Sequence, residues 1–280
     1  MLRIIPRLDI KGPDLVKGIH LEGLRVLGNP EIFAEYYYRH GADELIYQDV
    51  VASLFERNSL DDLITKTSKR IFIPLTVGGG IRNLQDIERV LKAGADKVSI
   101  NTAALRDPEF IIRASQKYGA STIVVAIESI KGDDGRYYAF MDNGREPSGS
   151  EVVEWALQAQ SMGAGEILLT SVDRDGTGAG FDVDLASSLA GQLHIPLVVH
   201  GGPGQLADYQ TLLDSAPIDG IAVASMLHYE LLNDRQFDRS EAVEGNNSFV
   251  SANRLFSQFD TCGLQSLKHY LRDNQVEVRL

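Results

Sequence analysis

Short apolar segments alternate with helix-forming segments along most of this sequence, and that alternation restricts the fold more than any other feature. Eight apolar segments have the length of buried strands, and caps or glycines mark the helices between them. They begin at or near Arg3, Glu44, Ile73, Lys97, Ser121, Glu166, Pro196 and Gly220. Eight regularly spaced strand–helix units predict an α/β fold, a closed (β/α)8 TIM barrel. A doubly wound open sheet is the alternative, but it seldom needs eight equally spaced units.

The two halves of the sequence resemble each other. Val77-Gly78-Gly79-Gly80 in the first half corresponds to His200-Gly201-Gly202-Pro203 in the second, and Asp9 corresponds to Glu128. This internal similarity predicts one domain over residues 1–280, a barrel built from two similar half-barrels with one strand-end carboxylate in each.

Several local patterns extend this prediction. Residues 11–28 read as a polar loop, and residues 131–147 as an inserted hairpin that turns at Asp133-Asp134-Gly135. Residues 148–151 have the pattern of a capping box for the helix that follows. The polar stretch 233–263 is predicted to be a surface insertion before a final helix.

The strand-end carboxylates are the first candidates for chemistry, because the carboxyl ends of barrel strands face the substrate. Asp9 and Glu128 are predicted to lie across the mouth, where two carboxylates suit general acid–base catalysis. Asp49 and Asp175 are predicted instead to bind substrate or to hold loops by hydrogen bonds. Lys17 is either a cover for the substrate or a solvated lysine.

Two glycine clusters are the second candidates, since glycine lets backbone N–H groups approach a phosphate closely. The first cluster is Gly79-Gly80 with Asn101-Thr102, and the second is Gly201-Gly202 with Ala224-Ser225. Tight strand-to-helix turns are the alternative explanation for each cluster. The matched pair predicts a small substrate with a phosphate at each end.

Charged residues stand at four strand starts, at the opposite end of the barrel from these sites. They are Arg3, Glu44, Lys97 and Glu166. Buried charges need partners, so these four should form ion pairs. They then form either a salt-bridged plug or a gate.

Composition excludes other classes of function. A net charge of −12 argues against general nucleic-acid binding, and no apolar run is long enough for a membrane span. The one cysteine, Cys262, excludes an internal disulfide and a thiolate metal cluster. The six histidines show no metal-ligand spacing, and no dinucleotide or Walker motif is present. These features, with the absence of a signal-peptide pattern, predict a cytoplasmic protein without metal or cofactor.

Several motifs, in the same order, resemble the cyclase subunit of imidazole glycerol phosphate synthase, the HisF family. The matching stretches include Arg3-Ile-Ile-Pro with Leu8-Asp9, Leu15-Val-Lys-Gly18, Ile73 to Arg82, Gly94 to Asn101, Gly163 to Ser171 and Asp173 to Thr177. They cover nearly all of residues 1–230 and the final helix.

The resemblance implies a heterodimer with a glutaminase subunit that supplies ammonia. The ammonia enters at the strand-start end through a gate of Arg3, Glu44, Lys97 and Glu166. It then reacts with a bis-phosphorylated ribulosyl aminoimidazole carboxamide to give imidazole glycerol phosphate and aminoimidazole carboxamide ribotide. The resemblance also implies that Thr170 and Gly176 belong to the substrate site.

The sequence departs from the family pattern near the mouth. Glu128 stands where the family has aspartate, Arg7 where it has cysteine or another small residue, and His200 where it has serine or alanine. These departures keep two alternatives open. One is a paralogue that delivers ammonia to another acceptor, such as a nucleotide sugar in surface-polysaccharide amidination. The other is a non-catalytic barrel that activates a glutaminase.

Overall fold

A closed ring of eight parallel strands forms the centre of the molecule, a computed structural model that describes residues 1–51, 60–233 and 259–280. The barrel strands are β1 (Arg3–Lys11), β4 (Leu45–Asp49), β5 (Leu75–Gly78), β6 (Lys97–Ile100), β7 (Ile123–Lys131), β10 (Glu166–Ser171), β11 (Leu197–His200) and β12 (Gly220–Val223). Pairing of β10 with β7 closes the ring, so the predicted (β/α)8 barrel is confirmed.

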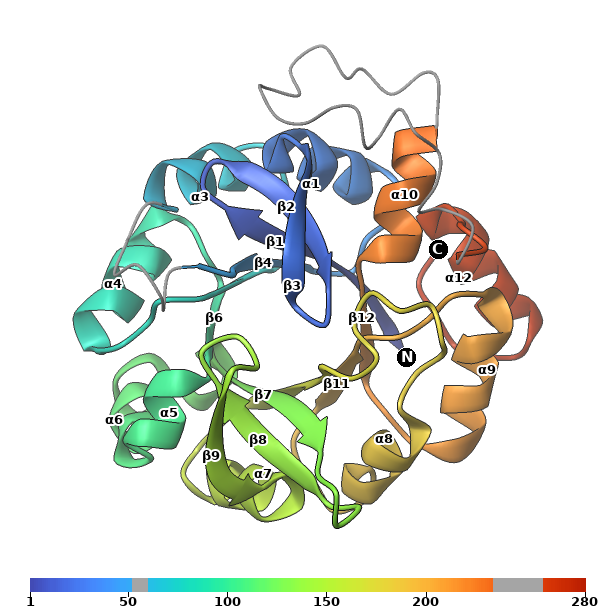
Figure 1. Ribbon diagram of the computed structural model, residues 1–280. Coiled ribbons are helices and arrows are strands. Elements are labelled where there is room, and N and C mark those ends of the chain that lie inside the picture. Colours follow the sequence, from blue (N-terminus) through green and yellow to red (C-terminus); the bar gives the residue numbers. More distant parts are fainter. Residues whose placement is uncertain (52–59, 234–258) are drawn as a thin grey trace.

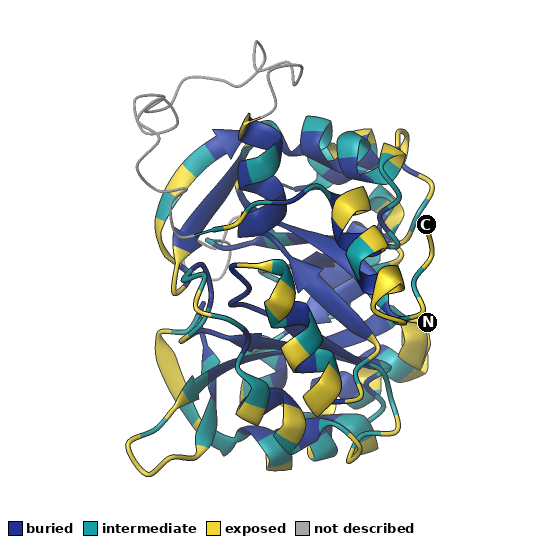
Figure 2. Ribbon diagram, turned by 90° about the vertical axis from the view of Figure 1, so that its right-hand side faces the viewer, coloured by how far each residue is buried: buried dark blue, intermediate teal, exposed yellow. Residues whose placement is uncertain are grey.

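Helices surround the strands (Figure 1). They are α1 (Pro30–Arg39), α3 (Asp61–Ser68), α4 (Leu84–Ala93), α5 (Thr102–Arg106), α6 (Glu109–Tyr118), α7 (Val152–Ser161), α8 (Val183–Leu189), α9 (Leu206–Ser215), α10 (Ser225–Asn233) and α12 (Leu264–Asp273), with a 3-10 turn at Ala120–Thr122. Buried strands lie inside and the outer helix surfaces are exposed (Figure 2). No helix in the described ranges combines the length and apolarity needed to cross a bilayer.

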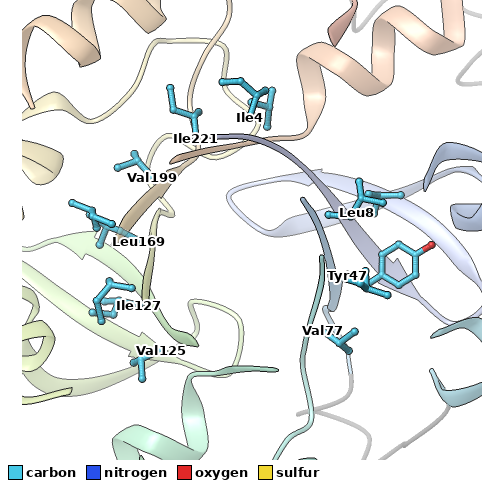
Figure 3. Packing of buried hydrophobic residues seen from close by; sticks show 14 of the residues in the cluster. Ile4, Leu8, Tyr47, Val77, Val125, Ile127, Leu169, Val199 and Ile221 are labelled. Atoms are coloured by element: carbon cyan, nitrogen blue, oxygen red, sulfur yellow. The ribbon is translucent and has the colours of Figure 1, made fainter. Parts of the chain in front are cut away.

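The alternation of side chains along each strand divides the apolar residues into two layers. Ile4, Leu8 and Tyr47 point outward toward the helices, as Figure 3 shows. A smaller cluster fills the interior of the barrel. It comprises Ile5, Ile46, Val124, Ala126, Leu168, Val198 and Ala222.

Local signals in the sequence placed several element ends correctly. Asn29 caps α1 by accepting a hydrogen bond from Glu31 N, and Pro30 occupies the first turn. Gly94 ends α4 in the left-handed conformation at φ 119°. The inserted hairpin is confirmed, because β7 turns back into β8 (Tyr137–Met141) with Lys131 paired to Tyr137, and β9 (Glu146–Glu151) then pairs with β8.

Other local predictions were wrong. Residues 11–28 are not a loop but a second hairpin, β2 (Asp14–Ile19) and β3 (Glu22–Gly28), in which β2 pairs with an extended β1. Residues 148–151 are the end of β9, and α7 begins after Glu151 with no side-chain cap. The predicted surface insertion falls largely on residues 234–258, which lie outside the described residues.

The two hairpins therefore extend the barrel strands that carry the proposed catalytic carboxylates. β1 continues past Asp9 to pair with β2, and β7 continues past Glu128 to pair with β8. In the view along the barrel axis the hairpins lie on opposite sides of the mouth (Figure 1).

Candidate active site

The two predicted carboxylates occupy opposite sides of the mouth. The ring order β10-β11-β12-β1-β4-β5-β6-β7 places β1 and β7 four strands apart in either direction. Asp9 on β1 and Glu128 on β7 are both buried. A molecule bound across the mouth would therefore have one carboxylate on each side.

Asp9 lies between two cations. Arg7 Nε donates a 2.9 Å hydrogen bond to Asp9 Oδ1, and Lys17 Nζ lies 3.4 Å from Asp9 Oδ2. Burial alone would raise the pKa of the Asp9 carboxyl, but the charges of Arg7 and Lys17 outweigh burial and hold that pKa below its usual range. Asp9 is therefore ionised at neutral pH.

Glu128 lies in a different environment. Burial raises the pKa of its carboxyl to about 7, although the nearby Arg7 charge and a 2.8 Å hydrogen bond from Gly144 N act in the opposite direction. A carboxyl with this pKa is partly protonated at neutral pH and can donate a proton. The mouth thus holds one ionised carboxylate and one partly protonated carboxyl group.

Lys17 is buried and forms its shorter ion pair with Asp175, at 2.8 and 2.9 Å. The solvated alternative for Lys17 is wrong, because the β2–β3 hairpin folds over the mouth. His20 N donates to the backbone oxygen of Asp175 at 2.9 Å, and Leu21 N lies 3.4 Å from its carboxylate. Asp175 therefore holds the hairpin tip, as one of its two predicted roles requires.

A cavity of about 280 Å³ joins the first glycine cluster to Glu128. Its lining includes Asp49, Gly79, Gly80, Asn101 and Thr102 together with Gln48, Arg82, Ser99, Arg106 and Asn143. A Cβ at Gly79, where φ is +95°, would lie 2.2 Å from the backbone oxygen of Asp49, so the wall requires glycine. Asp49 also accepts from Val51 N at 3.0 Å and so holds the following turn.

The cavity at the second cluster is much smaller. Gly201, Gly202, Ala224 and Ser225 line a cavity of about 10 Å³ with Asp175, Gly176, His200, Pro203 and Phe259. This is the room of roughly one water molecule. Burial and the Arg7 charge lower the pKa of the His200 imidazole, whose Nε2 lies 3.3 Å from Asp175 Oδ1. His200 is therefore neutral at pH 7.

Comparison with known proteins identifies the family. A family model described as "Histidine biosynthesis protein" matches residues 3–233. The imidazole glycerol phosphate synthase subunit HisF of Legionella pneumophila is 50% identical over 208 residues, which cover 74% of this chain and 98% of that protein. Subunits of the same name from Dehalococcoides mccartyi and Alkaliphilus metalliredigens are 44% and 42% identical over 227 residues, covering 81% of this chain and 89% and 90% of theirs.

The chain belongs to the HisF family. Arg7, Glu128 and His200, which the sequence analysis singled out as differing from the expected family pattern, are all buried in the mouth.

The four strand-start charges form the predicted ion-pair ring at the other end of this HisF-family barrel. Arg3 Nη1 lies 2.7 Å from both Glu44 Oε1 and Glu166 Oε2. Lys97 Nζ lies 2.9 Å from Glu44 and 3.5 Å from Glu166. The ring lies beneath the interior apolar cluster.

Sequence reasoning left two features out of the site. Arg7 was noted only as a departure from the family, yet it contacts Asp9 and donates to Thr170 Oγ1 at 3.1 Å. Its alternation with Ile5 and Asp9 on the inward face of β1 was the available signal. The hydrogen bond from Gly144 to Glu128 had no signal, because it depends on how the β8–β9 turn folds back.

No group of three or more His, Cys, Asp or Glu side chains within the described ranges is arranged to hold a metal ion.

Proposed function

We propose that this chain is the cyclase subunit of imidazole glycerol phosphate synthase and that it receives ammonia from a glutaminase subunit. Its substrate is the bis-phosphorylated ribulosyl aminoimidazole carboxamide, and its products are imidazole glycerol phosphate and aminoimidazole carboxamide ribotide. The observation that carries this proposal is the pair of opposed carboxylates, Asp9 and Glu128, between two glycine clusters of matching design.

The environments of the two carboxylates support distinct roles. The ionised Asp9 accepts a proton from the substrate, and the neutral form of Glu128 supplies one to the leaving group or ring nitrogen. Gly79, Gly80, Asn101 and Thr102 bind one phosphate through backbone and side-chain donors. The residues around Gly201 and Ser225 bind the other.

Ammonia is proposed to reach the mouth through the barrel interior. The ion-pair ring of Arg3, Glu44, Lys97 and Glu166 forms the entrance, and the apolar cluster above it passes neutral ammonia far more readily than ammonium.

The glutaminase subunit is proposed to dock around this entrance. Three of the exposed large hydrophobic residues, Met1, Phe72 and Leu280, belong to the strand-start end, because Met1 precedes β1, Phe72 precedes β5 and the Leu2–Val278 bridge holds the C-terminus there. Phe72 is 80% exposed. Exposed aromatic and aliphatic side chains around a polar centre are typical of a protein interface.

Turnover with saturating ammonium salt, no glutaminase and the bis-phosphorylated substrate tests the cyclase assignment. Asp9→Asn and Glu128→Gln should each abolish turnover, while Asp134→Asn, in the exposed turn between β7 and β8, should not. Binding without turnover in the wild type would mean that Glu128 does not reach the reacting atoms. No binding would contradict the substrate assignment.

One observation favours the alternative acceptor. The second glycine cluster leaves a cavity of only about 10 Å³, because Phe259 and His200 contribute to its walls. An acceptor that places phosphate only at the first cluster fits this asymmetry. Failure of the bis-phosphorylated substrate to bind, with inorganic phosphate still bound near Gly79, would support the alternative.

A further inference from the structure

Arg7 is a charged side chain inside the barrel wall that neither the proposed acid–base pair nor the phosphate sites use. Along β1 the inward-facing residues are Arg3 in the ion-pair ring, Ile5 in the apolar cluster, then Arg7 and Asp9 in the mouth. The Arg7 side chain is 3% exposed. A guanidinium buried to this extent needs several polar partners, and its position is therefore fixed by them.

The contacts of Arg7 reach across the mouth. Its Nε donates to Asp9 on its own strand, and its Nη1 donates to Thr170 Oγ1 on β10 at 3.1 Å. Thr170 is the register partner of Glu128 on the neighbouring β7. The guanidinium thus extends from one proposed catalytic carboxylate to the strand beside the other.

Of the two cations that contact Asp9, Arg7 makes the shorter contact. Lys17 lies on the β2–β3 hairpin, 3.4 Å from Asp9 but 2.8 Å from Asp175. Arg7 lies on the barrel wall and holds Asp9 at 2.9 Å. If Lys17 moves with the hairpin when substrate enters, Asp9 keeps its contact with Arg7.

Other charged or titratable groups act on Asp9 from the elements around it. They are Lys17 of β2, Glu128 of β7, Asp175 after β10, His200 of β11 and His228 of α10. Both histidines have lowered pKa values through burial, and Lys17 is shared with Asp175. Lys17 offsets the charge of Asp175, and Arg7 is therefore the cation that offsets the charge of Asp9.

We propose that Arg7 is a positioning residue of the mouth, whose guanidinium orients the Asp9 carboxylate from the barrel wall and, through Thr170, holds a positive charge beside the strand of Glu128. This inference rests on the proposed acid–base roles of Asp9 and Glu128. It assigns Arg7 no contact with the reacting atoms. Its effect should be on kcat and on the pH profile, with little effect on KM.

The test compares Arg7→Met, Arg7→Lys and the exposed control Arg113→Met. Carboxyl ¹³C NMR follows the titration of Asp9 and Glu128, with Asp9→Asn and Glu128→Gln identifying the two signals. In Arg7→Met both midpoints should rise, Glu128 by about one pH unit or more. Turnover, expressed per free ammonia, should fall about 100-fold, since the loss of one contact lets Asp9 shift within the site.

Arg7→Lys separates charge from geometry. It keeps a cation, so the Glu128 midpoint should stay near the wild-type value, but one ammonium group cannot bridge Asp9 and Thr170, so kcat should recover only partly. Arg113→Met should match the wild type in both measurements. If Arg7→Met does not fold, the kcat of Arg7→Lys tests the proposal alone: a reduced kcat supports it and a wild-type kcat contradicts it.

Unchanged midpoints in folded Arg7→Met would overturn the proposal, as would wild-type kcat in Arg7→Lys or in Arg7→Met. A wild-type protein without turnover would contradict the proposed function instead. The NMR midpoints would still report whether Arg7 controls the two carboxylates, so the two failures are distinguishable.

Discussion

At the scale of single residues, the buried Glu128 carboxyl should make stability depend on pH. Its pKa rises from 4.5 to about 7 on folding, chiefly through burial. Between these values the folded state holds a proton that the unfolded state releases, so the free energy of unfolding falls as pH rises through this window. Glu128→Gln cannot titrate. In denaturant unfolding, the stability of this variant relative to the wild type should therefore increase by about 2.5 kcal/mol from pH 5 to pH 8.

The exposed Glu109 of α6 supplies the control for that measurement. Its side chain is 81% exposed, and Glu109→Gln should keep a nearly constant offset from the wild type over the same range. A constant offset for Glu128→Gln would mean that the Glu128 carboxyl is solvated in the folded protein.

The sequence placed Asp9 and Glu128 on opposite strands at the mouth, because each follows the apolar run of its strand. The prediction that each ends its strand was wrong, since β1 runs on to Lys11 and β7 to Lys131 to form the two hairpins. The sequence could not place Lys17, because the burial of Lys17 depends on a hairpin that crosses the mouth to Asp175. Contacts between residues 158 positions apart leave no local pattern. The acid–base assignment could not be predicted for the same reason, since burial and distant charges set both pKa values.

At the scale of elements, the loop after β5 should not tolerate a side chain at Gly79. Gly79 and Gly135 both have positive φ, +95° and +81°, but only at Gly79 would an added Cβ meet backbone, 2.2 Å from Asp49 O. Gly135→Ala should cost about 1 kcal/mol of stability through φ alone. Gly79→Ala should cost about 3 kcal/mol or more, since the wall must also move.

Thermal unfolding with and without inorganic phosphate checks this prediction. Phosphate should raise the Tm of the wild type and of Gly135→Ala, because ligand that binds only the folded state stabilises it. The rise should be smaller in Gly79→Ala, because only the proposed phosphate site around Gly201 and Ser225 remains intact. Equal losses in the two variants would show that the close approach of Gly79 to Asp49 does not shape the loop.

Helix ends and turns were predicted correctly where the residues that determine them lie within one short segment. The Asn29 cap, the Gly94 stop and the β7–β8 turn are local, and each was found. The β2–β3 hairpin was missed because its pairing has register shifts and its first strand pairs with a continuation of β1. Residues 148–151 match a capping box in composition, but Ser148 donates to Ala139 O within the hairpin instead.

At the scale of the whole molecule, the barrel interior forms one column between two dissimilar ends. The ion-pair ring closes the strand-start end, seven apolar side chains fill the middle, and Arg7 with Thr170 lies in the mouth at the other end. The proposed glutaminase docking surface and the proposed cyclase site therefore share no residue. Damage to one end should leave the chemistry of the other intact.

Phe72→Glu tests this separation. An exposed anchor replaced by a charge should weaken docking of the glutaminase subunit by about 2 kcal/mol or more, and glutamine-dependent turnover at limiting subunit concentration should fall roughly 30-fold. Turnover with ammonium salt should stay at the wild-type rate, since Phe72 lies at the opposite end of the barrel from Asp9. Asp9→Asn should abolish both reactions. Loss of both in Phe72→Glu would mean that the two ends are coupled through the barrel, and loss of neither would place the docking surface elsewhere.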